Sequence, residues 1–172
     1  QKLERAAGVR GAALRLIASF LADRRFRVRL PGGRVSRWAD LPSGTPQGAG
    51  WSPTLWAVAI ADLPSQISGE VVCLADDVNV IVSDRNPAKG RDKMDAAVRE
   101  GSAYMNSSRI RPAAEKTQLR LIPAGRQKSE AEQAVVCEMD GKRVQPSPTV
   151  NILGAVIDEQ LTGEPQAAAA CK

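Results

Sequence analysis

Residues 71–82 read VVCLADDVNVIV, and this stretch carries the clearest structural signal in the chain. Two runs of β-prone apolar residues flank a polar centre, which predicts two strands within residues 70–83 that pair as a hairpin. The tip of that hairpin would hold Asp76 and Asp77. Adjacent carboxylates repel each other unless a cation neutralises them, and hard divalent cations such as Mg²⁺ prefer oxygen ligands. Taken alone, the stretch is compatible with a metal site, but it favours an ordinary turn, because aspartate is common in turns.

The segment upstream of this hairpin combines a loop with a helix start. Residues 41–53 are rich in Gly, Pro, Ser and Thr, which predicts a loop whose glycines let the backbone approach a ligand closely. Gln47 adds an amide that both donates and accepts hydrogen bonds. Ser52 and Pro53 then predict a helix to about residue 63, with Ser52 as its N-cap and an N-terminus that favours anions. The absence of a Gly-Lys-Ser/Thr sequence here excludes a P-loop, but an ordinary connecting loop stays open.

Further elements follow from hydrophobic spacing and turn residues. Apolar residues with period two at 26, 28 and 30 predict a half-buried strand with a basic outer face, which returns through residues 35–38 as a hairpin. Helices are expected at 11–22, at 91–107 and from 167 onward, and strands at 118–122, 134–139 and, as a pair centred on Gly154, 150–157. Asp140-Gly141 is a strong turn signal. Helices that alternate with antiparallel hairpins predict an α+β fold rather than a doubly wound parallel sheet.

Composition excludes several classes of protein. The 172 residues contain no histidine, which rules out His-based triads, HExxH metalloproteases and His-ligated zinc fingers. The three cysteines are scattered, so neither a zinc site nor a disulfide framework is expected, and an intracellular setting fits. The longest uncharged apolar run, residues 55–61, is too short to span a bilayer, so no membrane partner is expected.

Charge is concentrated at the start of the chain. The net charge is +5, but residues 1–37 hold ten Lys and Arg residues against two acids. Such a density attracts phosphate and releases counterions from nucleic acid, although an ordinary solvated surface remains the alternative.

Five segments, in order, carry a family resemblance. SGTPQGAGWSPTLWAVAIADLP at 43–64 and VVCLADDVNVIV at 71–82 resemble the nucleotide-pocket and catalytic motifs of the reverse transcriptase palm. More narrowly, they resemble the reverse transcriptases of non-LTR (LINE-type) retrotransposons. Residues 8–30, 105–122 and 150–162 are similar to three further family segments. The resemblance implies a partial α+β polymerase domain: basic fingers and palm at 1–40, palm at 41–125, and primer-grip region with the start of the thumb at 126–172.

The same resemblance assigns roles residue by residue. It implies RNA-directed DNA synthesis from an RNA template, a DNA primer and deoxynucleoside triphosphates, with two Mg²⁺ ions (Mn²⁺ is possible), in the cytoplasm and nucleus. Asp76 and Asp77 would be catalytic metal ligands, and Lys116 would approach the pyrophosphate. The nucleotide-binding residues would be Pro46, Gln47 and Gly48. The primer grip would be Ile152, Leu153 and Gly154, and the nucleic-acid contacts Arg25, Arg27 and Arg29.

The chain also departs from the family pattern. Leu74 stands where the family usually has an aromatic residue, Ala49 where it commonly has serine and Ala113 where it often has asparagine. The family's first catalytic carboxylate lies upstream of residue 8, so we expect that these 172 residues alone do not polymerise. A catalytically dead relic that retains the fold and nucleic-acid binding is the alternative. A viral RNA-dependent RNA polymerase is disfavoured, because those enzymes carry GDD in place of LADD.

Overall fold

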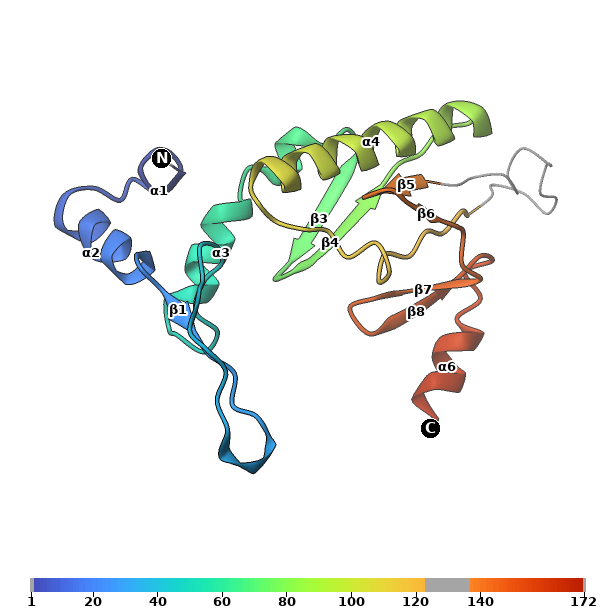
Figure 1. The fold of residues 1–172 in the computed structure, drawn as a ribbon. Helices are drawn as coiled ribbons and strands as arrows, with labels where there is room; N and C mark the ends of the chain where they lie inside the picture. Colours follow the sequence, from blue (N-terminus) through green and yellow to red (C-terminus); the bar gives the residue numbers. More distant parts are fainter. Residues whose placement is uncertain (1, 123–136, 172) are drawn as a thin grey trace. The chain divides into compact units, whose positions relative to one another are not determined.

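The structure, a computed structural model, describes residues 2–122 and 137–171. Within them, helices alternate with four two-stranded antiparallel sheets, which confirms the α+β fold (Figure 1). The chain divides into an N-terminal unit, Gln1–Asp62, and a C-terminal unit, Leu63–Lys172. No helix among the described residues has the length and apolar composition needed to cross a membrane.

The N-terminal unit contains three helices and one hairpin. Its elements are α1 (Lys2–Arg5), α2 (Gly11–Leu21), β1 (Arg25–Phe26), the 3₁₀ helix η1 (Pro31–Gly33), β2 (Ala39–Asp40) and α3 (Ser52–Ile60). Lys2 joins α1 to α3, because its ammonium donates to the Ala59 carbonyl and pairs with Asp62, both at 2.8 Å. The apolar stripe expected on residues 11–22 is half-buried in α2, whereas Leu16, off the stripe, is exposed.

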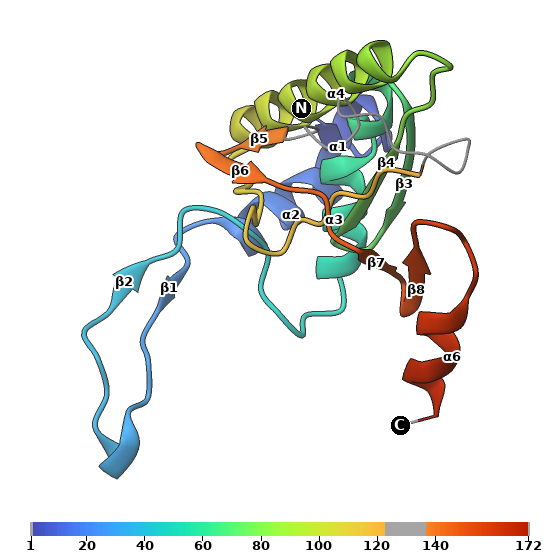
Figure 2. The same ribbon diagram turned by 90° about the vertical axis from the view of Figure 1, so that its right-hand side faces the viewer.

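The hairpin at residues 25–40, which we call the arm, differs from its prediction. Ladder pairing joins only β1 to β2, and a single bridge from Arg29 to Val35 follows nearer the tip. The return strand holds one extra residue between these pairings, and the Ser36 hydroxyl accepts from the Val28 amide at 2.8 Å, as in a β-bulge. Both views show the arm extending away from α2 and α3 (Figure 2).

The expected half-buried strand at residues 25–30 is therefore wrong in its burial. Phe26, Val28 and Leu30 are 44%, 50% and 40% exposed. Alternation predicts a buried face only where a second layer covers it, and a two-stranded ribbon has no second layer of its own.

The C-terminal unit has a long helix packed on a hairpin. Its elements are η2 (Leu63–Gln66), β3 (Glu70–Leu74), β4 (Asp77–Ile81), α4 (Pro87–Ser107), β5 (Cys137–Met139), β6 (Lys142–Val144), β7 (Thr149–Ile152), β8 (Ala155–Asp158) and α6 (Glu164–Ala170). Leu63, Ile67 and Ala97 form a buried cluster against one face of β3 and β4. A second cluster joins Leu119, Cys137 and Val144.

Two predicted helices begin earlier than expected. Helix α4 starts at Pro87 because the Asn86 side chain caps it, accepting from the amides of Ala88 at 2.9 Å and Lys89 at 3.4 Å. Helix α6 starts at Glu164, after Gly163 in a left-handed conformation. The predicted helix from Ser52 is confirmed but ends at Ile60, and η2 follows.

The strand expected at residues 118–122 is wrong. Only Leu119 makes a bridge, in parallel with Pro146. Proline has no amide hydrogen to donate, so the ladder does not extend past this contact. Of the strand expected at 134–139, residues 137–139 form β5, and residues 134–136 lie outside the described part of the chain.

Candidate active site

Asp76 and Asp77 lie together at the tip of a two-residue hairpin. Strand β3 pairs with β4 so that Leu74 lies opposite Asp77, which leaves Ala75 and Asp76 as the turn. Ala75 adopts a left-handed conformation with φ 52°, which is unfavourable for a residue with a Cβ. Both aspartates are exposed. The predicted hairpin is confirmed, and its strained turn presents two carboxylates to solvent.

The base of this hairpin is held against α4. Glu100 of α4 accepts two hydrogen bonds from Ser68, from its amide at 2.6 Å and from its hydroxyl at 3.0 Å. Gly69 then enters β3 with φ 138°, where a Cβ would lie 3.0 Å from the Ile81 carbonyl oxygen. Only glycine fits this close approach, so the path of the chain into the hairpin is tightly defined.

The two faces of the hairpin differ. Val71, Cys73, Val78 and Val80 pack towards the cluster of Leu63, Ile67 and Ala97. On the opposite face, Val72, Leu74 and Ile81 are 45%, 56% and 51% exposed. Leu74, which replaces the family's aromatic residue, lies on this open face opposite Asp77. Its substitution therefore changes the surface beside the carboxylates and leaves the buried cluster intact.

The loop with the proposed nucleotide-binding residues forms a turn ahead of α3. The Ala49 amide donates to the Pro46 carbonyl at 3.4 Å, and Gly48 at the third position has φ 81°, as a type II turn requires. Gln47 and Gly48 are exposed, and Pro46 is half-buried.

Ser52 differs from its predicted role as N-cap. It is the first helical residue of α3, and its buried hydroxyl donates to the Pro46 carbonyl. Ser52 therefore ties the helix start to the turn that presents Gln47 and Gly48.

Arg24, three residues after the end of α2, supports the same loop, a role that sequence reasoning missed. Its guanidinium donates to the carbonyls of Gly44 at 2.6 Å and Ser43 at 3.3 Å, and also to Leu21 at the end of α2 at 3.1 Å. The basic residue at a helix end was visible in the sequence, but its second partner lies 20 residues away.

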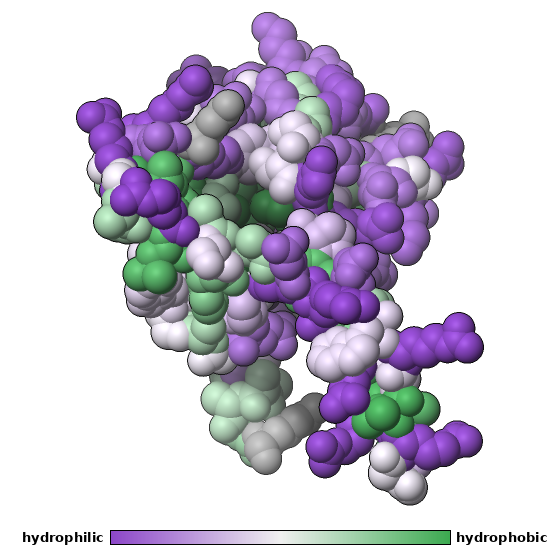
Figure 3. Space-filling view, turned by 60° about the vertical axis from the view of Figure 1, so that its left-hand side comes forward, coloured by the Kyte–Doolittle hydropathy of each residue, from purple (hydrophilic) through white to green (hydrophobic). Residues whose placement is uncertain are grey.

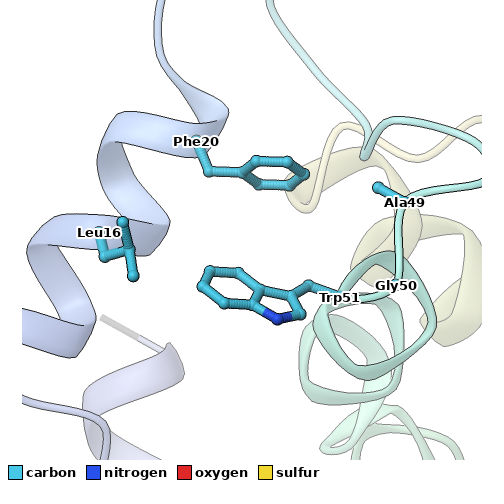
Figure 4. A pocket seen from close by; sticks show the side chains of 5 residues that line it. All are labelled: Leu16, Phe20, Ala49, Gly50 and Trp51. Carbon is cyan, nitrogen blue, oxygen red and sulfur yellow. The ribbon is translucent and has the colours of Figure 1, made fainter.

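An apolar pocket of about 330 Å³ adjoins this loop within the N-terminal unit. Figure 4 shows Phe20 and Leu16 of α2 facing Trp51 across it. The rings of Phe20 and Trp51 lie 5.9 Å apart at 59°, a tilted aromatic pair. Ala49, where the family has serine, lines the pocket and adds no polar group to it.

Lys116 lies in a turn of the C-terminal unit. The amides of Lys116 and Thr117 both donate to the Ala113 carbonyl, at 2.9 and 3.1 Å, and Ala114 is buried beneath the turn. The Lys116 side chain is exposed. Ala113 takes part through its carbonyl, so the family's asparagine is not needed to close this turn.

The proposed primer-grip residues form the tip of a second hairpin. Ile152 pairs with Ala155, and Leu153 and Gly154 between them have φ of 54° and 85°, the signature of a type I′ turn. Leu153 is 53% exposed despite its left-handed backbone. This turn presents an apolar side chain to solvent at a conformational cost.

Polar contacts connect the Lys116 segment to this second hairpin. The Asn151 amide donates to the Gln118 side chain at 2.7 Å. Arg120, whose side chain is 7% exposed, forms an ion pair with Glu159 just after β8 and donates to the Ser147 carbonyl. Burial lowers the pKa of Arg120, and the charge of Asp158 opposes that shift. Sequence reasoning missed Gln118 and Arg120, because nothing local identifies their distant partners.

The family comparison gives a clear result. A family model described as reverse transcriptase (RNA-dependent DNA polymerase) matches residues 6–157. The chain belongs to the reverse transcriptase family. No curated protein and no solved structure matches it significantly. The family's RNA-directed DNA polymerases act on nucleic-acid template, primer and nucleotide substrates, generally with divalent metal ions.

The donor set of this reverse transcriptase domain suits a hard cation. Asp76 and Asp77 offer only oxygen ligands, which Mg²⁺ prefers. Among residues 2–122 and 137–171, however, no three His, Cys, Asp or Glu side chains gather as a metal site. The hairpin tip therefore fits as two ligands of a metal centre that needs further oxygen donors.

The site residues of this reverse transcriptase domain fall into both units. Pro46, Gln47 and Gly48 belong to the N-terminal unit, as do the arginines of the arm. The aspartate pair, Lys116 and the primer-grip turn belong to the C-terminal unit. Within that unit the structure connects the Lys116 segment to the primer-grip hairpin through Gln118.

Proposed function

We propose that this domain is the polymerase core of a non-LTR retrotransposon reverse transcriptase, which adds deoxynucleotides to a DNA primer on an RNA template. The observation that carries the proposal is the Asp76–Asp77 pair, exposed at a strained hairpin tip in a chain of this family. A non-glycine residue in a left-handed conformation at an exposed turn, as Ala75 is here, is a feature that functional sites often show.

Asp76 and Asp77 would hold Mg²⁺, with Mn²⁺ as a possible substitute. Bound there, two such ions would activate the primer 3′-hydroxyl and stabilise the leaving pyrophosphate oxygen. The protein's own contribution is to keep two carboxylates side by side and exposed, above an apolar cluster that fixes the hairpin.

The remaining site residues would position the substrates. The turn at Pro46, Gln47 and Gly48 would line the deoxynucleotide pocket, with exposed backbone at Gly48 that allows close approach. Exposed Lys116 would place a cation near the pyrophosphate. Ile152, Leu153 and Gly154 would hold the primer end, and the conformational cost at Leu153 is consistent with a contact made to a substrate.

Primer extension tests the proposal, with the chain expressed as part of its full native reading frame rather than as the 172 residues alone, and with an RNA template, a DNA primer, Mg²⁺ and the four deoxynucleotides. Asp76→Asn keeps the size of the side chain and removes its charge, so we expect extension to fall by about 100-fold or more. Asp140→Asn is the matched control, because Asp140 is also an exposed aspartate at a two-residue hairpin turn.

Equal activity of Asp76→Asn and the parent would refute the assignment of Asp76. No extension by a folded parent protein that still binds RNA would favour the catalytically dead relic. In that case the residues to revert first are Leu74, Ala49 and Ala113, the three departures from the family pattern.

A further inference from the structure

The arm carries large side chains with little to pack against. Besides Phe26, Val28 and Leu30, two residues of the return strand are exposed: Val35 is 47% and Trp38 is 54% exposed. An isolated two-stranded hairpin is marginally stable in water, and a group of exposed apolar side chains rimmed by polar ones is typical of an interaction surface. In the space-filling view, hydrophilic and hydrophobic side chains alternate over the arm (Figure 3).

One face of the arm combines arginine with an aromatic ring. The register pairs Arg25 with Asp40 and Phe26 with Ala39, so Arg27 comes opposite Trp38. The Arg27 guanidinium lies 4.9 Å from the centre of the Trp38 ring, a cation–π contact. Arg25 and Arg29 lie two residues to either side of Arg27, and alternate residues of a strand share a face. This face therefore presents a row of arginines beside an indole.

The charge of the arm selects the kind of partner. Residues 25–40 contain five arginines, no lysine, and one acid, Asp40, which pairs with Arg25 at 3.4 Å. Four arginines remain uncompensated by acids within the arm, so a second copy of this surface would be repelled. A polyanion is attracted, and it releases counterions on binding.

From these observations we infer that the arm binds single-stranded nucleic acid, with one base stacked on the indole of Trp38 and the neighbouring phosphates on the arginine row. Arg27 lies over the indole, and Trp38 is 54% exposed, so part of the ring surface remains available to a base. A base offers a π-face of matching size to the indole in a single strand, whereas duplex bases are already stacked on each other. Successive arginines on this face are about 6.6 Å apart, close to the phosphate spacing of an extended strand.

This inference deepens the proposed function, because it assigns the arm to the unpaired part of the template. Binding of a single strand by the arm does not depend on catalysis, so this inference and the proposed polymerase activity can be refuted separately. Under the proposed function, Asp76→Asn lowers primer extension by about 100-fold or more. The arm of this variant is unchanged, so its affinity for a single strand should equal that of the parent.

The test is fluorescence anisotropy of a labelled 15-nucleotide oligouridine and a labelled 15-base-pair DNA duplex, titrated with the whole chain. Trp38→Ala should weaken binding to the single strand about tenfold and binding to the duplex by less than twofold. Val35→Ala is the matched control, because it removes an exposed apolar side chain from the same arm. Trp38→Phe keeps an aromatic face and should retain most of the affinity.

Arginine is tested by salt dependence. Arg27→Ala should reduce the slope of log K against log salt by about 0.7, the value for one phosphate contact to a single strand. Arg15→Ala, which removes an exposed arginine from α2, should leave that slope unchanged if binding is confined to the arm.

Equal loss of affinity in Trp38→Ala and Val35→Ala, or equal loss for single strand and duplex, would overturn the inference. If Trp38→Ala fails to fold, the inference is tested instead by the affinity of Trp38→Phe and by the salt dependence of binding in Arg27→Ala. Loss of affinity in Trp38→Phe as large as that expected for Trp38→Ala would exclude stacking. Concentration-dependent self-association of the parent that Trp38→Phe abolishes would assign the arm to a second copy instead.

Discussion

Gln118 and Asn151 are joined across 33 residues of sequence by a hydrogen bond of 2.7 Å from the Asn151 amide to the Gln118 side-chain oxygen. The Asn151 side chain in turn accepts from the Gly154 amide at 3.0 Å. A continuous path of polar contacts therefore runs from the Lys116 segment to the primer-grip turn.

Replacing Gln118 tests this path. Gln118→Ala leaves the Asn151 amide without its acceptor, so we expect a loss of about 1 kcal/mol in the free energy of unfolding. Gln118→Glu keeps an acceptor at the same reach and should lose less than half of that. Urea denaturation measures both, with Gln145→Ala as an exposed glutamine control. Equal losses in Gln118→Ala and Gln145→Ala would show that the contact does not stabilise the fold.

Two glycines within α4 should respond oppositely to alanine. Glycine within a helix usually costs about 1 kcal/mol relative to alanine. An added Cβ at Gly90 would lie 3.8 Å from the Asp84 Cβ, an ordinary contact, so Gly90→Ala should stabilise by about 0.5–1 kcal/mol. At Gly101 the Cβ would lie 3.3 Å from Ile67 Cδ1, and buried Ile67 has little room to move.

We therefore expect Gly101→Ala to be destabilising by about 1 kcal/mol, because crowding outweighs the gain in helix propensity. Thermal or urea unfolding measures the stability of Gly90→Ala and Gly101→Ala relative to the parent and tests both expectations. Gly101→Ala as stabilising as Gly90→Ala would mean that α4 and η2 are less closely packed than the structure shows.

Cys137 should make the fold sensitive to alkaline pH. Burial, with the charge and a hydrogen bond of Asp95, raises the pKa of this thiol from 9.0 to about 11. The unfolded chain loses the proton near pH 9, whereas the folded chain keeps it to about pH 11, so stability falls as pH rises between these values. The loss reaches on the order of 2 kcal/mol.

The check is urea denaturation at pH 8, 9, 10 and 11 with Cys137→Ala as the comparison. This variant should be less stable at pH 8, because it leaves a small cavity beside Leu119 and Val144, but its stability should fall less steeply with pH. Burial also raises the pKa of Cys73, which both proteins retain, so Cys73 does not affect the difference. Parallel pH curves for the two proteins would contradict the prediction.

Local signals predicted the hairpins and the site turns well. The Asp76–Asp77 tip, the Asp140-Gly141 turn and the Gly154 hairpin depend on residues within about ten positions of each other, and the structure confirms all three. The start of α4 also has a local signal, since Asn86-Pro87 combines a good cap with proline at the first turn.

Burial and long-range support could not be predicted in the same way. Residues 26–30 alternate between apolar and charged side chains, but nothing in the local sequence shows whether another layer of structure packs on the apolar face. The failed strand at 118–122 depends on Pro146, 27 positions beyond Leu119. Arg24, Gln118 and Arg120 are ordinary polar residues in sequence, and only their partners in space make them structural.

The turns at Asp140-Gly141 and Leu153-Gly154 have the same backbone but different first residues, with φ of 51° and 54°. Aspartate tolerates the left-handed region, whereas this conformation costs about 1 kcal/mol for leucine. Because Leu153 is 53% exposed, burial of its side chain offsets little of that cost. Leu153→Asn should therefore stabilise the domain by about 0.5–1 kcal/mol, and Asp140→Leu should destabilise it by a similar amount.

Primer extension adds the functional half of this comparison. If Leu153 contacts the primer end, Leu153→Asn should be more stable in urea yet extend primers more slowly, whereas Asp140→Leu should be less stable with its rate per folded molecule unchanged. A Leu153→Asn variant that is less stable than the parent would remove the argument from backbone strain. A Leu153→Asn variant that is more stable than the parent and equally active would show that the strained backbone at Leu153 does not serve primer binding.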